Sequence, residues 1–406
     1  MTYREKLKEY QEGNLSLEET KKIEEEIEKY QAISDYLFES EEIPELQDLF
    51  EEDQNKGQEQ DFVTLVNQSI KKAFRKLGCI ILAVALAVLL FLQFLLPHLV
   101  SAFYYDPGKK NGEYNNQMSL DMAVFSELFL PGKRREIVSV EDKGYGNYEI
   151  SIIQHASYNG SFSNTAGEIK KGKIRFYDDS GIRRPTGNAF AWSGAPGDGS
   201  KPLDEILTDG TDVQCAAGTP EDAKETLENL VPGEKYIGYV SLNHIMDYET
   251  FRSYLEKQED LGGIWCAVDT GQYEEDRFFA GNIGFTCDLE FSSDLEWDEE
   301  TYPELILWNP KVVEERGEDE LLEKMKTEEF MKTHVCSMMN YMADQTQFYE
   351  MMGGGYFTRL GLKNAVEHIQ KEGIRIYGYA AVMDKDKALE LSSQEEVYEI
   401  YVENLR

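Results

Sequence analysis

The chain has 406 residues, of which 41 are Lys or Arg and 77 are Asp or Glu, so its formal net charge is −36. This balance excludes an unaided nucleic-acid-binding protein, which presents basic side chains to phosphates, and it disfavours attachment to an anionic membrane through a polybasic face. Hydrophobic residues make up 41% of the chain, which is enough to build a core, and the length suits roughly two or three folded units.

The first 45 residues contain two amphipathic helical patterns. Apolar side chains recur at helical spacing within residues 3–10, and a second helix is expected to begin at Ser16. Glu19 stands three residues beyond Ser16, which predicts a capping box that satisfies backbone N–H groups at the helix start. One face of residues 23–37 is apolar and the opposite face is acidic. We therefore predict that residues 1–45 form a small all-α domain.

Two helices in so short a segment have little core of their own, so their apolar stripe packs against a further helix or is completed by a partner protein. A solvated acidic spacer is the alternative, but the stripe is more apolar than a spacer requires. Each stripe residue suits an internal core as well as an interface. The candidate partner-binding residues are Leu7, Tyr10, Leu15, Leu17, Ile23, Ile27 and Tyr30.

Residues 77–97 form the predicted transmembrane helix. The run from Leu77 to Leu96 contains no charged side chain, and about twenty residues rising about 1.5 Å each span the roughly 30 Å of a bilayer core. The 76 residues that precede the run argue against a cleaved signal peptide. Residues 46–76 are predicted to form an acidic linker that ends in an amphipathic juxtamembrane helix.

Four cations lie immediately before this run, whereas Lys109 and Lys110 are the nearest cations beyond it. The positive-inside rule then places the N-terminal head in the cytoplasm and the chain from about residue 104 outside the cell membrane. We expect a single-pass membrane protein. The residues that set this topology are Lys71, Lys72, Arg75 and Lys76.

The charge is unevenly divided along the chain. Residues 1–70 carry seven basic and twenty acidic side chains, a net charge of −13, and the four juxtamembrane cations contribute +4. Residues 77–406 carry 30 basic and 57 acidic side chains, a net charge of −27. The head is therefore the most acidic part per residue, which suits a basic partner.

The region beyond the span is predicted in three parts. Residues 104–130 are expected to form a polar stalk, with exposed loops of the kind that proteases cut. Residues 131–221 are expected to be β-rich, because short alternating segments are separated by Gly, Asn and Ser. Residues 222–406 are expected to form an extracellular α+β sensor domain. Their order of strand, helix, strand, strand, helix and strand is consistent with a ferredoxin-like unit.

Cysteine and catalytic motifs add little to the functional interpretation. Cys215, Cys266, Cys287 and Cys336 all fall in the predicted outer region, where disulfides persist, and their three possible pairings stay open. The sequence contains no H-E-x-x-H, Walker loop or G-x-S-x-G. We therefore expect a protein that is not an enzyme, with no catalytic residues, no metal site and no cofactor.

Several segments resemble one bacterial regulator family. The string LKEYQEGNLSLEETKKIEEEIEKYQAISDYL resembles the N-terminal domain of membrane-anchored anti-sigma factors, in a zinc-free form because Glu26, Tyr30 and Ile33 occupy the positions of the zinc ligands. Residues 62–148, which include YYDPGKKNGEYNN and FLPG, resemble the N-terminal region of the sigma-factor regulators of Firmicutes. Residues 222–405, which include YIGYVSLNH, GIWCAVDTG, NIGF and IRIYGYAAVMD, resemble their C-terminal region.

The resemblance implies a membrane-anchored anti-sigma factor. Its cytoplasmic head would sequester an extracytoplasmic-function sigma factor, and its outer domain would sense the state of the envelope through an unknown ligand or partner. It would make no direct contact with nucleic acid. Two alternatives remain open: a single-pass extracellular binding or cell-wall-active domain with a short cytoplasmic tail, and a membrane-tethered scaffold for another cytoplasmic protein.

Overall fold

The computed structural model describes residues 10, 16–39, 59–156, 161–197, 199–207, 215–259, 261–274, 276–279, 281–287, 294–353 and 359–405. The chain divides into two compact units, Met1–Ala85 and Leu86–Arg406, which we call the N-terminal unit and the C-terminal unit.

The N-terminal unit contains helix α2 (Leu17–Glu39) and most of helix α3 (Glu59–Leu90). α2 begins directly after Ser16, as the sequence predicts. The Glu19 carboxylate accepts hydrogen bonds from the backbone N–H of Ser16 at 3.3 Å and from its hydroxyl at 2.6 Å. This contact caps a helix start that would otherwise leave N–H groups without partners.

Beyond α3 the helical path continues through a π-helical turn, η1 (Phe91–Leu95), into helix α4 (Leu96–Ser101). Together, residues Ser69–Ser101 form a 33-residue helix that is long and apolar enough to cross a membrane, and no part of its most apolar window is buried within the structure. This helix covers the predicted transmembrane segment, residues 77–97.

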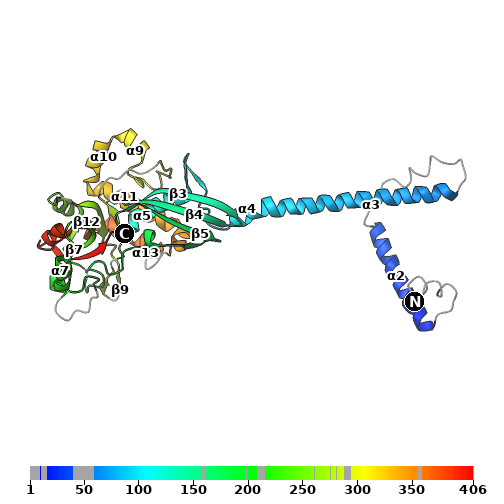
Figure 1. Cartoon of the computed structure of the whole chain (residues 1–406), viewed down its shortest axis with the longest axis horizontal. Helices are drawn as coiled ribbons and strands as arrows, with labels where there is room; N and C mark the ends of the chain where they lie inside the picture. Colours follow the sequence, from blue (N-terminus) through cyan, green and yellow to red (C-terminus); the bar gives the residue numbers. More distant parts are fainter. Residues whose placement is uncertain are drawn as a thin grey trace. The chain divides into compact units, whose positions relative to one another are not determined.

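Two antiparallel sheets form the frame of the C-terminal unit (Figure 1). The smaller sheet is a four-stranded meander in the order β3-β4-β5-β6, and the larger has the order β11-β8-β12-β7-β13. The meander strands are β3 (Lys133–Gly144), β4 (Asn147–Ala156), β5 (Phe162–Lys170) and β6 (Lys173–Phe176). The larger sheet contains β7 (Lys235–Asp247), β8 (Gly262–Val268), β11 (Gly284–Thr286), β12 (Arg375–Asp384) and β13 (Val397–Asn404). Two short ribbons pair β1 (Lys110–Asn111) with β2 (Asn115–Asn116) and β9 (Tyr273–Glu274) with β10 (Arg277–Phe278).

The strand order overturns the expected ferredoxin-like unit. A ferredoxin-like sheet pairs its first and third strands in parallel, and these would be β7 and β11. Here β8 and β12 separate β7 from β11, every neighbouring pair is antiparallel, and β13 adds a fifth strand beside β7. The C-terminal unit is α+β, as predicted, with a different topology.

Helices cover these sheets. Helix α5 (Gln117–Phe129) packs against β3, β11 and α11, and α11 packs against α13. The described part of the C-terminal unit contains, besides α4 and α5, η2 (Ser180–Ile182), α6 (Leu203–Ile206), α7 (Pro220–Glu228), α8 (Tyr248–Leu255), α9 (Pro310–Arg316), α10 (Glu318–Met325), α11 (Glu328–Asp344), α12 (Thr346–Met351), α13 (Arg359–Glu372) and α14 (Lys385–Leu391).

The predicted stalk, residues 104–130, is instead part of the folded core. It contains the β1–β2 ribbon and α5, in which Met118, Phe125 and Leu128 are buried. An amide hydrogen bond from Ser119 to the Asn116 side chain caps the helix start. Because α5 is apolar around most of its circumference, it is stable only where other elements enclose it. Exposed positions remain in the loop before α5, where Tyr114 is 83% exposed.

The regions 131–221 and 222–406 share one hydrophobic core rather than forming separate domains. This core joins α5, the inner face of the meander, one face of the larger sheet and the helices α11–α13. The opposite face of the larger sheet is covered by Phe190 and Trp192, from a segment between β6 and β7 that contains no strand among its described residues. The Trp192 indole donates a 2.7 Å hydrogen bond to the Leu242 carbonyl. Cys215, Cys287 and Cys336 carry free thiols.

Candidate functional site

Helix α2 exposes its apolar face to different degrees along its length. Ile23 is 6% exposed, Ile27 is 36% exposed and Tyr30 is 68% exposed. These three side chains share one face, because residues three, four and seven apart are neighbours on a helix. The sequence of α2 carries eight acidic and three basic residues. α2 therefore combines a buried apolar anchor with exposed apolar side chains on an acidic helix.

The remaining candidate contacts are less fully described. The Tyr10 hydroxyl donates a 3.3 Å hydrogen bond to the Glu24 carboxylate, so the chain at Tyr10 lies against α2. Leu17 is the first residue of α2, but its side chain lies outside the described part. Leu7 and Leu15 lie outside the described residues. Their role as partner contacts stays a prediction.

The four predicted topology residues lie near the start of the apolar helix. Lys71, Lys72, Arg75 and Lys76 are all exposed in α3. At about 1.5 Å per residue, the Ser69–Ser101 helix is roughly 50 Å long, which exceeds the roughly 30 Å of a bilayer core. If the apolar residues occupy the hydrocarbon, these four cations lie beyond it, beside the headgroups.

The far end of the apolar helix is bonded to the meander, whose strand ends lie beside α4 (Figure 1). The Tyr145 hydroxyl donates a 2.8 Å hydrogen bond to the Leu92 carbonyl, and the Gly146 N–H donates one of 2.8 Å to the Ser101 hydroxyl. In the π-helical register the Leu96 N–H reaches the Phe91 carbonyl. In the same register, the Leu92 carbonyl would accept a hydrogen bond from the N–H of residue 97, but residue 97 is proline and has no N–H. Tyr145 supplies the donor that Pro97 lacks.

A buried carboxylate continues this connection into the core. Asp121 on α5 accepts hydrogen bonds from the Tyr105 hydroxyl at 2.5 Å, from the Tyr341 hydroxyl at 2.6 Å and from the Gln117 amide at 2.9 Å. Burial raises the pKa of Asp121 to about 6, although these three bonds lower it in part. The cluster joins the segment after the apolar helix to α5 and α11. The sequence offered no local signal for it, because Asp121 and Tyr341 are 220 residues apart.

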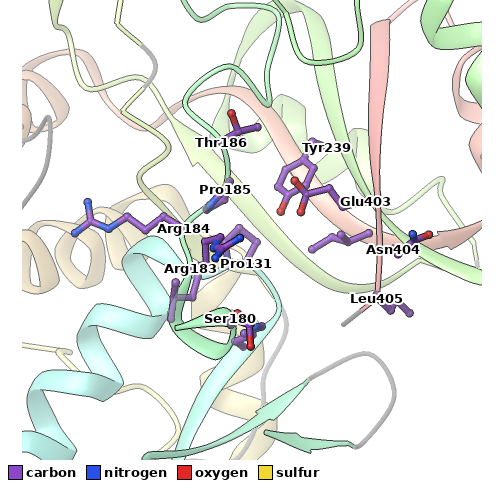
Figure 2. Close-up of a pocket in the computed structure, with 13 residues that line it drawn as sticks. Pro131, Ser180, Arg183, Arg184, Pro185, Thr186, Tyr239, Glu403, Asn404 and Leu405 are labelled. Atoms are coloured by element: carbon purple, nitrogen blue, oxygen red, sulfur yellow. Dashed lines mark hydrogen bonds between the residues drawn. The ribbon is translucent and has the colours of Figure 1, made fainter. Parts of the chain in front are cut away.

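A cavity of about 220 Å³ lies between the segment that follows β6 and the strands β7 and β13 of the larger sheet (Figure 2). Ser180, Arg183 and Pro185 lie on one side, and Tyr239, Glu403 and Leu405 lie on the other. The Arg184 side chain points away from the cavity, toward the Phe129 ring, whose centroid lies 4.2 Å from its guanidinium carbon. The cavity mixes cationic, anionic and apolar walls, so it suits a small amphipathic ligand.

Two pairs of buried titratable side chains connect elements of the fold, and neither pair is arranged for catalysis. The His334 ring lies 2.6 Å from the Glu304 carbonyl and 3.2 Å from the Glu127 carboxylate, which joins α11 to α5. The Cys215 thiol donates a hydrogen bond to Glu399, and burial, with that carboxyl, raises the pKa of Cys215 far above its usual range. A thiol held protonated is a poor nucleophile. Within the described part of the chain, no group of three or more His, Cys, Asp and Glu side chains is placed to hold a metal ion.

Comparison with known proteins finds a similarity within the C-terminal unit. Residues 227–404 match a family model described as sigma factor regulator C-terminal. This range includes all five strands of the larger sheet. No curated protein and no solved structure matches the chain. The match supports membership of a sigma-factor-regulator family, whose role is regulatory, and suggests an anti-sigma function.

Proposed function

We propose that this chain is a membrane-anchored anti-sigma factor. Its N-terminal unit binds an extracytoplasmic-function sigma factor in the cytoplasm, and its C-terminal unit senses the state of the envelope outside. The observation that carries the proposal is the exposure of Ile27 and Tyr30 on the apolar face of α2, in a chain whose residues 227–404 match a sigma-factor-regulator model.

In this proposal, opposite charge attracts the sigma factor and apolar contacts hold the complex. The DNA-contacting surfaces of sigma factors are basic, so the head, with a net charge of −13 over residues 1–70, attracts them over several ångströms. Ile27 and Tyr30 then enter an apolar groove, as exposed side chains of an amphipathic helix do. Occupation of that surface blocks RNA polymerase and promoter contacts, and no chemical step is needed.

The orientation follows from the cations at the start of the apolar helix. Lys71, Lys72, Arg75 and Lys76 favour a cytoplasmic N-terminus under the positive-inside rule. The C-terminal unit then lies outside, and the cavity between Arg183 and Tyr239 is a place where a small envelope ligand can bind. Because residues 104–130 fold into the core, a signal received there reaches the apolar helix through packed elements rather than through a loose stalk.

The test is capture of a sigma factor by the intact protein. Full-length chain, purified in detergent and immobilised, is incubated with the small sigma factor encoded closest to it, with and without core RNA polymerase. We expect stoichiometric binding that core polymerase competes away and that weakens as salt rises from about 0.05 to 0.5 M. Failure to bind any sigma factor of the same cell, with α2 still helical, contradicts the proposal and favours an extracellular domain with a short tail.

A further inference from the structure

The β3–β4 and β5–β6 turns of the meander lie level with the last residues of the apolar helix. Tyr145 in the β3–β4 turn bonds to Leu92, which lies four residues before the end of the apolar run at Leu96. Four residues of helix correspond to about 6 Å along its axis. The β5–β6 turn is held at the same level, because the Lys171 N–H donates a 2.8 Å hydrogen bond to the Gly146 carbonyl. Wherever the apolar helix enters the headgroup region, both turns enter it too.

The aromatic residues at this level match a membrane interface. Phe103 is 79% exposed and Tyr145 is 39% exposed. The Tyr104 ring is held between the two turns: a side chain added at Gly146 would approach it to 2.7 Å, and one at Gly172 to 3.8 Å. Aromatic rings of this kind gather at the edges of membrane-spanning segments, where they contact both hydrocarbon and water.

The same turns carry a local excess of positive charge. Residues 142–146 and 170–173 include four lysines and a single acidic residue, Asp142, although the C-terminal unit as a whole is strongly acidic. Lys143 pairs with Glu141 and Glu149, and Lys170 pairs with Glu168, all on the strands behind the turns. Lys171 and Lys173 are exposed and form no ion pair with the described residues. These two exposed cations, which no ion pair holds, are available to an anionic partner, although Glu350 lines the same cavity as Lys173.

We propose that the β3–β4 and β5–β6 turns rest on the outer surface of the membrane, where Lys171 and Lys173 bind the phosphates of anionic phospholipids. The inference rests on the membrane anchorage proposed above and not on sigma-factor binding. The total charge of the chain disfavours attachment to an anionic surface, but only the charge within about 10 Å of the headgroups acts on them. Contact with the bilayer fixes the C-terminal unit at the membrane.

Fluorescence quenching in vesicles locates the turns. The full-length chain is reconstituted with Tyr145→Trp or, as a second probe that leaves the Tyr145 bond intact, Phe103→Trp. The matched control is Phe162→Trp, which is 63% exposed at the opposite end of β5, about 26 Å from Lys170 along the strand. Lipids brominated high on the acyl chain are expected to quench the first two probes several-fold more than the control. Equal quenching of all three overturns the proposal.

Headgroup binding is tested by moving the bromine between lipids. In vesicles of fixed phosphatidylglycerol and phosphatidylcholine content, bromine is carried by one lipid or the other. Each surface lysine contributes about fivefold preference for anionic lipid, so brominated phosphatidylglycerol should quench Trp at position 145 at least about fivefold more effectively. Lys171→Glu with Lys173→Glu should abolish the preference, and Lys224→Glu with Lys257→Glu, exposed elsewhere, should retain it. No preference in the parent overturns headgroup binding, and so does a preference that survives reversal of Lys171 and Lys173.

The experiments can contradict the anti-sigma function and the membrane contact independently of each other. Loss of sigma-factor capture with normal quenching overturns the anti-sigma function and leaves the membrane contact standing. Normal capture by a chain that resists alkaline extraction from vesicles, without quenching at positions 103 and 145, overturns the membrane contact alone.

Discussion

The Tyr105 hydroxyl donates a 2.5 Å hydrogen bond to the Asp121 carboxylate. Tyr105 lies four residues beyond the last residue of α4, and Asp121 lies in the buried helix α5. Because Tyr341 of α11 donates to the other oxygen of the same carboxylate at 2.6 Å, three separated segments meet at one side chain. The bond thus ties the exit of the apolar helix to the core that carries the regulator-family sequence.

At about pH 4, where the buried Asp121 carboxyl is protonated and its raised pKa costs little stability, Asp121→Asn should destabilise the C-terminal unit by about 1–3 kcal/mol. An amide retains one acceptor oxygen and directs N–H donors at the second hydroxyl, so a buried hydroxyl loses its acceptor. Denaturant unfolding of the full-length chain in detergent, followed by tryptophan fluorescence, measures the change. Asp276→Asn is the control, since Asp276 is exposed at φ +63°, which asparagine tolerates equally well. Equal stability of the two variants contradicts the assigned role of Asp121.

Glu399→Gln should remove part of the pH dependence of stability. Burial raises the pKa of Glu399 to about 7, although the hydrogen bond from Cys215 lowers it in part, and the pKa in the unfolded chain is about 4.3. The folded state binds this proton more tightly, so the free energy of unfolding falls as pH rises from about 4 to 7. Glutamine stays neutral, and the variant should be more stable than the parent at pH 8 by roughly 1–3 kcal/mol.

Thermal unfolding at several pH values between 5 and 8 measures this difference. Asp121, with its pKa of about 6, also makes the free energy of unfolding fall as pH rises toward 6. The Glu399→Gln variant should retain this contribution of Asp121. A parent and a variant with parallel profiles from pH 5 to 8 would show that Glu399 is ionised in the folded protein throughout this range.

Gly146→Ala should loosen the contact between the meander and the apolar helix. Gly146 has φ +72°, and a Cβ there would lie 2.7 Å from the Tyr104 ring. The left-handed backbone alone costs an alanine about 1–2 kcal/mol, and displacement of Tyr104 adds to it. Gly187→Ala is the matched control, because nothing lies within 4 Å of a Cβ at Gly187. Thermal unfolding should show a lower midpoint for Gly146→Ala and no comparable change for Gly187→Ala.

Reversal of Lys71, Lys72, Arg75 and Lys76 to Glu, with added lysines after Ser101, should invert the chain in the membrane, because the distribution of basic residues sets the orientation. A reporter enzyme that is active only outside the cell, fused after Leu405, measures the orientation. Its activity should fall at least tenfold. The same fusion with Lys109 and Lys110 neutralised should keep its orientation. Full reporter activity in the reversed variant would mean that other features determine topology.

Local sequence signals predicted the local elements well. The predicted capping contact between Ser16 and Glu19 precedes α2, and the regions predicted to be β-rich and α+β contain strands and helices. The sequence does not predict two strands of the main sheets. β5 has the small residues Thr165 and Gly167 on its buried face, and β13 follows the short helix α14, which the sequence also does not predict. Both are strands because neighbouring strands pair with them, which is information that lies elsewhere in the chain.

Packing between segments far apart in the sequence explains the larger differences between the sequence-based predictions and the structure. α5 was taken as part of a stalk because polar residues surround it, yet contacts with β3, β11 and α11 bury it. Residues 310–344 form three helices, which are separated at Gly317, with φ +84°, and again after Met325. The Tyr105–Asp121–Tyr341 cluster and the cavity in Figure 2 join residues far apart in sequence. No spacing rule identifies such sites without the fold.

The most direct test of the central claim is sigma-dependent transcription in vitro with two single-residue variants of α2. Ile27→Asp places a charge on the exposed apolar face, and Ala32→Asp places the same charge about 140° away on the same helix, at another exposed position. Full-length chain carrying Ala32→Asp should inhibit transcription as strongly as the parent, whereas Ile27→Asp should need at least tenfold more protein. Equal inhibition by both variants, each with a helical α2, would contradict the proposal that this face of α2 binds the sigma factor.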